Sequence, residues 1–211
     1  MILEQGHIYH IYNQGNNRQK IFFNRENYLF FLKKISKHIL PFADILAWCL
    51  MPNHFHLMIA VRADDQSDRA TWSPGDRVSV FKDNNSPGHY KKLNNSIATM
   101  LSSYTRAINI QQKRTGSLFR EGTKAVWLGC IETEKIKHQN RIKIEDVNVT
   151  NPGKEYLQTC FKYIHENPVK AGLANQITDW EFSSARDIAG IRKGSFINKK
   201  LIDELGLCLK K

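Results

Sequence analysis

Two histidines separated by one residue, His54 and His56, are the first side chains here whose types and spacing could do chemistry. They open the apolar run 54–61, which is predicted to be a strand. Successive side chains of a strand point to opposite faces, so the two imidazoles share a face and Phe55 points to the other. Imidazoles at this spacing can both reach one divalent cation. Taken alone, however, the pair more often marks a solvated polar face, so a metal site needs a further ligand from elsewhere.

Tyr163 and Asn167 are the second pair, on a helix predicted over 154–167 and ended by Pro168. Residues four apart on a helix are neighbours. A tyrosine beside a divalent metal can attack phosphorus, because the metal polarises the phosphate and offsets its charge. The amide oxygen of Asn167 is a ligand suited to Mg²⁺ or Mn²⁺. The alternatives are a half-buried aromatic side chain for Tyr163 and a residue that satisfies local helix carbonyls for Asn167.

Tyr104 is the competing nucleophile. It lies on the apolar stripe of a helix predicted over about 94–113, between Leu101 and Ile108, and this spacing is typical of a core residue. Arg106 of the same helix is interpreted as a phosphate contact or a solvated charge.

The remaining elements must position these side chains. The sequence predicts a strand over 7–12, a helix over 25–38 with Asn24 as its N-cap, and a strand region over 117–128. The strand 44–50 precedes the histidine strand and forms a hairpin with it. Two polar stretches rich in Pro, Gly and Asn are predicted to be long inserted loops, at about 62–93 and 132–153.

Composition limits the function classes. The chain has 211 residues, 41% apolar, with a formal net charge of +11. This length fits one domain, and the charge indicates a polyanionic partner, nucleic acid first, with a basic surface kept for solubility as the alternative. None of the four cysteines forms a CxxC pair; Cys49 and Cys160 are interpreted as small core residues, which suits a reducing cytoplasm. No signal peptide or run of about 18 apolar residues is visible, so no membrane partner is expected.

Three stretches together resemble the REP-associated tyrosine transposases, single-tyrosine transposases of the HUH endonuclease superfamily. These are YHIYNQGNNRQKIF at 9–22, WCLMPNHFHL at 48–57 and YIHENPVKAGL at 163–173. Weaker matches are TGSLFR at 115–120 and WEFSSA at 180–185. The matches are in order and span residues 7–190.

The resemblance implies an α+β fold with a ferredoxin-like core, in which a central antiparallel sheet carries the histidine pair and helices pack on one side. It implies that His54 and His56 are metal ligands, with Asn167 as the third. Tyr163 would then attack a DNA strand, leaving a 5′-phosphotyrosine and a free 3′-OH. The implied substrate is single-stranded DNA with short palindromic hairpins, and such a substrate suits a basic groove with aromatic side chains. The residues expected to contact DNA are Arg106, Arg114, Arg120, Lys124 and Lys170.

One departure from the family pattern concerns a possible DNA contact, because Thr123 stands where the family usually has an arginine. The proposed ligands and nucleophile are all present. The sequence therefore predicts one catalytic domain over 1–190, with a C-terminal extension over 191–211, acting as a cytoplasmic metal-dependent endonuclease that cuts and rejoins hairpin DNA. The alternatives are a non-catalytic DNA- or RNA-binding protein that retains the fold and a replication or mobilisation nickase. Monomer and homodimer both stay open.

Overall fold

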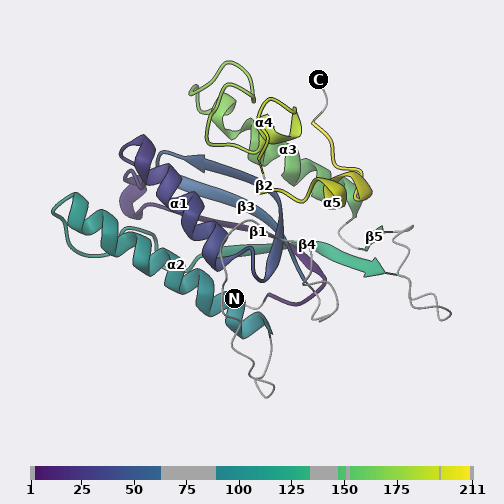
Figure 1. The fold of residues 1–211 in the computed structure, drawn as a ribbon, viewed down its shortest axis with the longest axis horizontal. Coiled ribbons are helices and arrows are strands. Elements are labelled where there is room, and N and C mark those ends of the chain that lie inside the picture. Colours follow the sequence, from purple (N-terminus) through teal and green to yellow (C-terminus); the bar gives the residue numbers. More distant parts are fainter. Residues whose placement is uncertain (1–2, 63–88, 134–146, 151–152, 195, 210–211) are drawn as a thin grey trace.

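One antiparallel sheet organises the chain. The computed structural model describes residues 3–62, 89–133, 147–150, 153–194 and 196–209. Within these ranges five strands pair in the order β2-β3-β1-β4-β5 (Figure 1). Their bounds are β1 His7–Gln14, β2 Ala43–Met51, β3 His54–Val61, β4 Lys124–Thr133 and β5 Val147–Thr150.

Two helices connect the first four strands and complete a ferredoxin-like α+β core, which confirms the predicted fold class. Helix α1 (Arg25–His38) links β1 to β2, and helix α2 (His89–Gln111) links β3 to β4. The later elements are α3 (Lys154–Lys170), α4 (Ala185–Ile188) and α5 (Lys199–Glu204), and a 3-10 turn, η1 (Asn16–Arg18), follows β1. No helix of the described ranges is long and apolar enough to cross a membrane.

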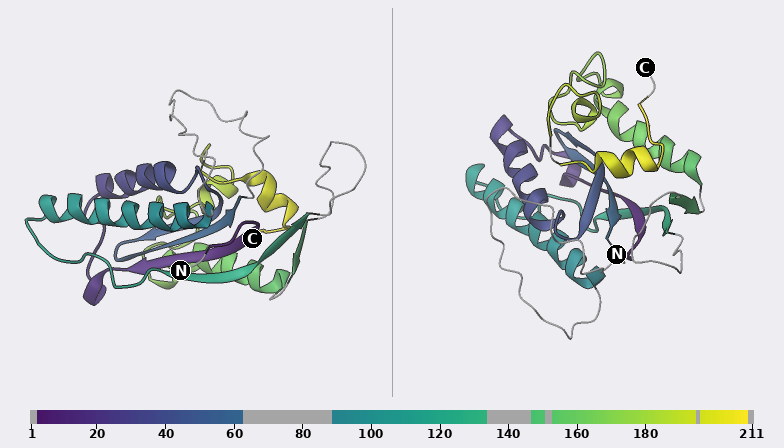
Figure 2. Two further views of the ribbon diagram at one scale, coloured as in Figure 1. Left: turned by 90° about the horizontal axis from the view of Figure 1, so that it is seen from below. Right: turned by 45° about the vertical axis from the view of Figure 1, so that its right-hand side comes forward.

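The helices lie on both faces of the sheet, and the expectation of helices on one side alone was wrong. Helices α1 and α2 cover the face of Phe55, whose ring lies 5.1 Å from that of Phe31. Helix α3 packs on the opposite face, mainly against β2, as the edge-on view in Figure 2 shows. The physical reason is a second apolar surface, because α3 buries its own stripe of Leu157, Phe161 and Ile164.

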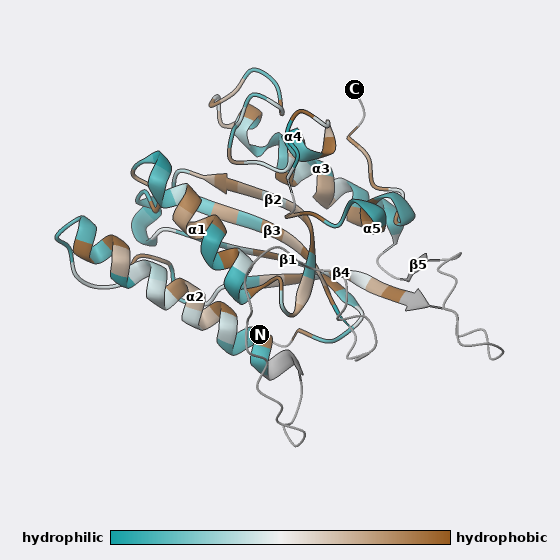
Figure 3. Cartoon of the chain, viewed as in Figure 1, coloured by the Kyte–Doolittle hydropathy of each residue, from teal (hydrophilic) through white to brown (hydrophobic). Residues whose placement is uncertain are grey.

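Local signals account for the first helix and the hairpin. The Asn24 side chain accepts a hydrogen bond of 3.0 Å from the Asn27 backbone N–H, so α1 begins where the sequence predicts it. Strand β2 is hydrophobic along most of its length in Figure 3, and so is much of β3. Every residue of β3 after His54 is buried, which is the pattern of a central strand covered on both faces.

Several element boundaries differ from the prediction. Helix α2 begins at His89, inside the first predicted loop, and β5 lies within the second. Of the remaining residues of those loops, the structure describes Arg62, Glu132, Thr133 and Gly153, and the others fall outside the described ranges. Helix α3 continues through Pro168, whose ring is buried, to Lys170, so the predicted end at Asn167 is three residues too early. Gly172, at φ 68°, follows its end.

The C-terminal segment packs on the same core. Residues Phe182–Ser184 run along the free edge of β2, with Leu50 N–H donating to the Phe182 carbonyl and Ser184 N–H to the Trp48 carbonyl, both at 2.9 Å. Further along, four apolar side chains join the hydrophobic core: Ile197, Ile202, Leu205 and Leu207.

Candidate active site on the histidine face of the sheet

The pairing of β1 with β3 places four polar aromatic side chains on one face. Tyr12 lies opposite His56, and His10 lies opposite Met58. Directly paired residues of antiparallel strands share a face, so His10, Tyr12, His54 and His56 all face the side covered by α3. The site therefore draws on two central strands and one helix.

His56 is buried between its neighbours, at 4% exposure. Its Nδ1 lies 2.9 Å from Nε2 of His10, and its own Nε2 is buried with no hydrogen-bond partner. Burial lowers the pKa of His10 to about 4 and holds the pKa of His56 well below its ordinary value, where the neighbouring His10 and His54 add to the effect. At neutral pH both rings are therefore uncharged, the form that binds metal ions.

His54 repeats this arrangement. Its Nδ1 donates a 2.6 Å hydrogen bond to Oδ1 of Asn53. Burial lowers the His54 pKa, and a side-chain hydrogen bond with Asn167 opposes that shift. Metal-binding histidines typically give one ring nitrogen to an acceptor and present the other to the ion. Both histidines of the pair have a partner on Nδ1, as such ligands do.

Helix α3 brings Tyr163 to the same place. Its side chain is 42% exposed, and its ring centroid lies 5.5 Å from that of His56 and 6.2 Å from that of His10. The ammonium of Lys170 lies 5.8 Å from the tyrosine ring centroid. Asn167 donates from Nδ2 to the Tyr163 carbonyl at 2.9 Å, which fixes its side chain along the helix. One chain thus supplies all four predicted residues to one site.

Tyr104 and Tyr12, the two tyrosines that could compete with Tyr163, differ sharply in burial. Tyr104 is fully buried and donates a 2.8 Å hydrogen bond to the Ile21 carbonyl, so it is the core residue that its spacing predicts. Tyr12 is half-buried, with its ring centroid 4.9 Å from that of His10 and 5.8 Å from that of His56. Sequence reasoning missed Tyr12 and His10 as site residues. The alternation over 7–12 puts both on one face, but it does not reveal which strand lies beside them.

The five predicted DNA contacts lie in three different places. Lys124 pairs with Tyr12 across β1 and β4 and is exposed, so it lies on the histidine face, as does Lys170. Arg106 is exposed on α2, a helix of the opposite face.

Arg114 follows the end of α2, and Arg120 lies in the segment that leads to β4. Arg114 donates to the Ser117 carbonyl at 3.1 Å, and the backbone of exposed Arg120 pairs with that of Gln14. Thr123 accepts a 3.0 Å hydrogen bond from Asn13, a structural role that an arginine there could not copy in the same way.

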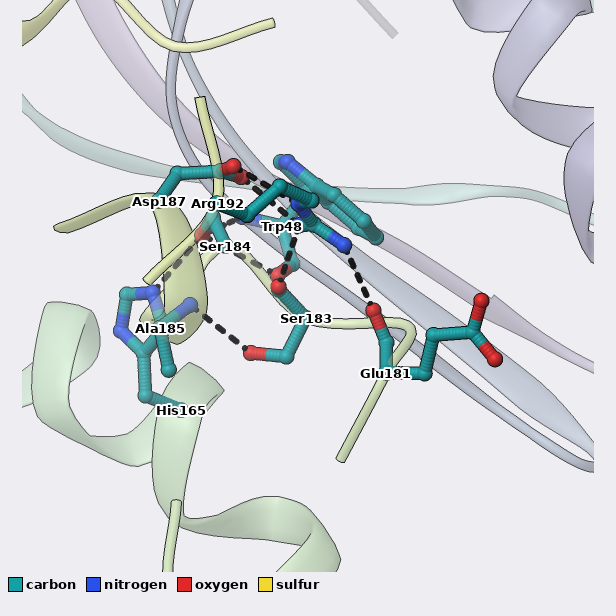
Figure 4. Close-up of polar contacts among 8 residues, drawn as sticks. All are labelled: Trp48, His165, Glu181, Ser183, Ser184, Ala185, Asp187 and Arg192. Carbon is teal, nitrogen blue, oxygen red and sulfur yellow. Dashed lines mark hydrogen bonds and ion pairs between the residues drawn. The ribbon is translucent and has the colours of Figure 1, made fainter. Parts of the chain in front are cut away.

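A buried histidine outside the predicted set anchors α3. His165 is fully buried, with Nδ1 2.7 Å from the Phe161 carbonyl and Nε2 2.7 Å from Ser184 Oγ. The Ser184 hydroxyl in turn contacts both backbone groups of Trp48 on β2 (Figure 4). The helix turn that carries Tyr163 and Asn167 is thereby tied to the sheet edge.

Arg192 holds the segment that follows. It pairs with both oxygens of Asp187 at 2.7 Å, and it donates to the carbonyls of Glu181 and Ser183 (Figure 4). Its guanidinium also lies 5.1 Å from the ring centroid of Trp48.

The donor set fits a hard cation only with added oxygen ligands. In the part of the chain that the structure describes, no three His, Cys, Asp or Glu side chains converge on a common point that could hold a metal ion. The unpartnered Nε2 of His56 and the adjacent His54 and Asn167 would supply two nitrogens and an amide oxygen. Phosphate oxygens and water would have to complete the coordination of Mg²⁺ or Mn²⁺.

Comparisons with known proteins bear on the fold. No protein-family model and no curated protein sequence matches the chain. A solved structure that does match is that of a REP-associated tyrosine transposase bound to a REP hairpin, with a TM-score of 0.51. The two chains are 15% identical, and the match covers 90% of this chain and 82% of the other. The protein therefore shares the fold of that transposase.

Proposed function

We propose that this protein is a metal-dependent, transposase-like endonuclease that cuts and rejoins single-stranded hairpin DNA through Tyr163. The observation that carries the proposal is the position of Tyr163: a half-exposed phenol 5.5 Å, centroid to centroid, from a buried histidine with an unpartnered nitrogen. The shared fold with a transposase that binds a REP hairpin supports the same reading.

The chemistry is one transesterification followed by its reverse. The Tyr163 oxygen attacks a backbone phosphorus, the phenol proton passes to water, and the bond from phosphorus to the 3′ oxygen breaks as that oxygen takes up a proton. The products are a 5′-phosphotyrosine and a free 3′-OH, and because the phosphotyrosine conserves the bond energy, a 3′-OH can later attack it without ATP.

The site residues divide the work. His54, His56 and Asn167 would hold Mg²⁺ or Mn²⁺, which when bound would polarise the phosphate and offset its charge. Lys124 and Lys170 add positive charge on the same face, which suits the backbone of a single strand. Lys170 also pairs with Glu166 at 2.7 Å, so it can exchange that carboxylate for a phosphate.

A covalent trapping assay tests the proposal. Hairpin DNA from the flanks of the protein's own gene, labelled at its 3′ end, is incubated with protein and Mn²⁺ or Mg²⁺ and run on a denaturing gel. A 5′-phosphotyrosine link retains the 3′ label, so wild-type protein should give a labelled protein band. A 5′ label should instead appear on a shortened free strand.

Three tyrosine variants identify the nucleophile. The labelled band should disappear in Tyr163→Phe and with chelator, and it should persist in Tyr12→Phe and Tyr104→Phe. Loss of the band in Tyr12→Phe with retention in Tyr163→Phe would assign the nucleophile to Tyr12 instead.

The competing function is a nucleic-acid-binding protein without catalysis. The absence of three strong metal ligands among the described residues is the observation in its favour. Tight binding of the same hairpins with no adduct and no cleavage, in either metal, would establish that function and reject the endonuclease.

A further inference from the structure

His10 is buried beside the histidine pair, and nothing in the proposed chemistry yet uses it. Its side chain is 7% exposed, and its Nε2 lies 2.9 Å from Nδ1 of His56. The ring centroids of the two histidines are 5.0 Å apart. His10 reaches this position because β1 and β3 pair directly, with Tyr12 opposite His56.

The tautomer of His56 decides whether it can be a ligand. A neutral imidazole carries one proton, so only one of its nitrogens has a free lone pair. His56 Nε2 is buried without a hydrogen-bond partner, and it can bind an ion only when the proton is on Nδ1. In that state Nδ1 needs an acceptor, and Nε2 of His10 is the atom within hydrogen-bond distance.

His54 offers an internal comparison. Its Nδ1 lies 2.6 Å from Oδ1 of Asn53, an oxygen that can only accept, so the proton of His54 is on Nδ1. The Nδ1 atoms of the two histidines thus have comparable partners, an amide oxygen for His54 and a third imidazole for His56. Such outer partners orient metal-binding histidines and hold their tautomer.

We propose that His10 is a positioning residue, which accepts the Nδ1 proton of His56 and so presents His56 Nε2 to the metal ion. This inference rests on the proposed function, since it gives His10 its role through a metal-bound His56. His10 itself does not touch the ion or the phosphate.

Two variants of His10 separate positioning from packing. In His10→Gln the amide oxygen can still accept from His56, whereas His10→Leu fills the space without an acceptor. The matched control is His38→Leu, which removes a partly buried histidine, hydrogen-bonded to Ser96 at 3.2 Å, from α1 on the opposite face of the sheet.

The first measurement is the affinity for Mn²⁺ at neutral pH, determined from the electron paramagnetic resonance signal of the free ion. His10→Leu should bind about 10- to 100-fold more weakly than wild type. His10→Gln and His38→Leu should stay within about threefold of wild type. Unchanged affinity in His10→Leu, with the Tyr163 adduct retained, would overturn the inference and leave the proposed function standing. Failure of wild-type protein to bind Mn²⁺ at all would instead overturn the proposed function and this inference with it.

The second measurement needs neither metal nor activity. Nitrogen-15 spectra of the histidine rings in metal-free protein should show His56 protonated on Nδ1 in wild type and in His10→Gln. In His10→Leu the proton should be distributed over both nitrogens. A wild-type His56 protonated on Nε2 would overturn the inference, and so would the same tautomer in all three proteins.

Discussion

Mild acid should lower the free energy of unfolding of this protein, and protonation of His165 should account for part of that decrease. The ring is fully buried in α3, between the Phe161 carbonyl and the Ser184 hydroxyl. Burial lowers its pKa to about 4, although the hydrogen bond to Phe161 and the carboxylate of Asp187 act in the opposite direction. The neutral ring satisfies both contacts, because Nδ1 donates to the carbonyl and Nε2 accepts from the hydroxyl.

The sign and size follow from linkage. Well above pH 6.5 the ring is neutral in both the folded and the unfolded chain, so it contributes no pH dependence there. As the pH falls below 6.5, the His165 ring binds a proton in the unfolded chain. In the folded chain the same ring binds a proton only at about pH 4. Between pH 7 and pH 5 this one residue should remove about 2 kcal/mol from the free energy of unfolding, and about 3 kcal/mol by the acid limit.

Urea unfolding at pH 7, 6 and 5 measures the effect. The variants His165→Asn and His165→Gln keep a donor and an acceptor but do not titrate, so their loss of stability over this range should be smaller than that of wild type by about 2 kcal/mol. A lower stability of either variant at pH 7 does not matter, because the comparison concerns the change with pH. An equal loss in wild type and in both variants would refute the reasoning.

Two further perturbations test the packing around the site by denaturant unfolding at neutral pH. Asn24→Ala removes the side chain that caps α1 by accepting from the Asn27 N–H, and should lower the free energy of unfolding by about 1 kcal/mol. A change close to zero would show that the cap does not stabilise the helix. Arg192→Met leaves the Asp187 carboxylate, which is 1% exposed, without its partner, and should lower the free energy of unfolding by about 3 kcal/mol. The double variant Arg192→Met with Asp187→Asn should recover part of that loss. No recovery in the double variant would contradict the unpaired-charge explanation.

Local patterns predicted the parts of this fold that depend on neighbours in the sequence. Asn24 and the spacing of Tyr28, Phe31 and Ile35 are enough to place α1, because a cap and a helical stripe are read within a few turns. The hairpin of β2 and β3 follows from two apolar runs around a short turn. His54 and His56 therefore appear on one face from the sequence alone.

The rest of the site depends on contacts between distant segments. His10 and Tyr12 reach His56 only because β1 pairs with β3 across more than 40 residues, and strand pairing carries no local signal. The role of His165 likewise depends on a distant residue, Ser184, which hydrogen-bonds to the ring and lies at the edge of β2. Pro168 misled the prediction in the opposite direction, since the local rule that ends a helix before a proline does not hold in the last turn of α3.

The segment Phe182–Ser184 has a consequence for solubility. Strand β2 lies at one end of the sheet order among the described strands, and its residues are almost all buried and apolar. An uncovered apolar edge strand is a template on which a second chain can add its own strand. Backbone contacts from Phe182, Ser184 and Asn198 occupy that edge, so the tail shields the sheet from self-association. A chain shortened before residue 182 should therefore aggregate, and its inactivity would say nothing about which side chains act on DNA.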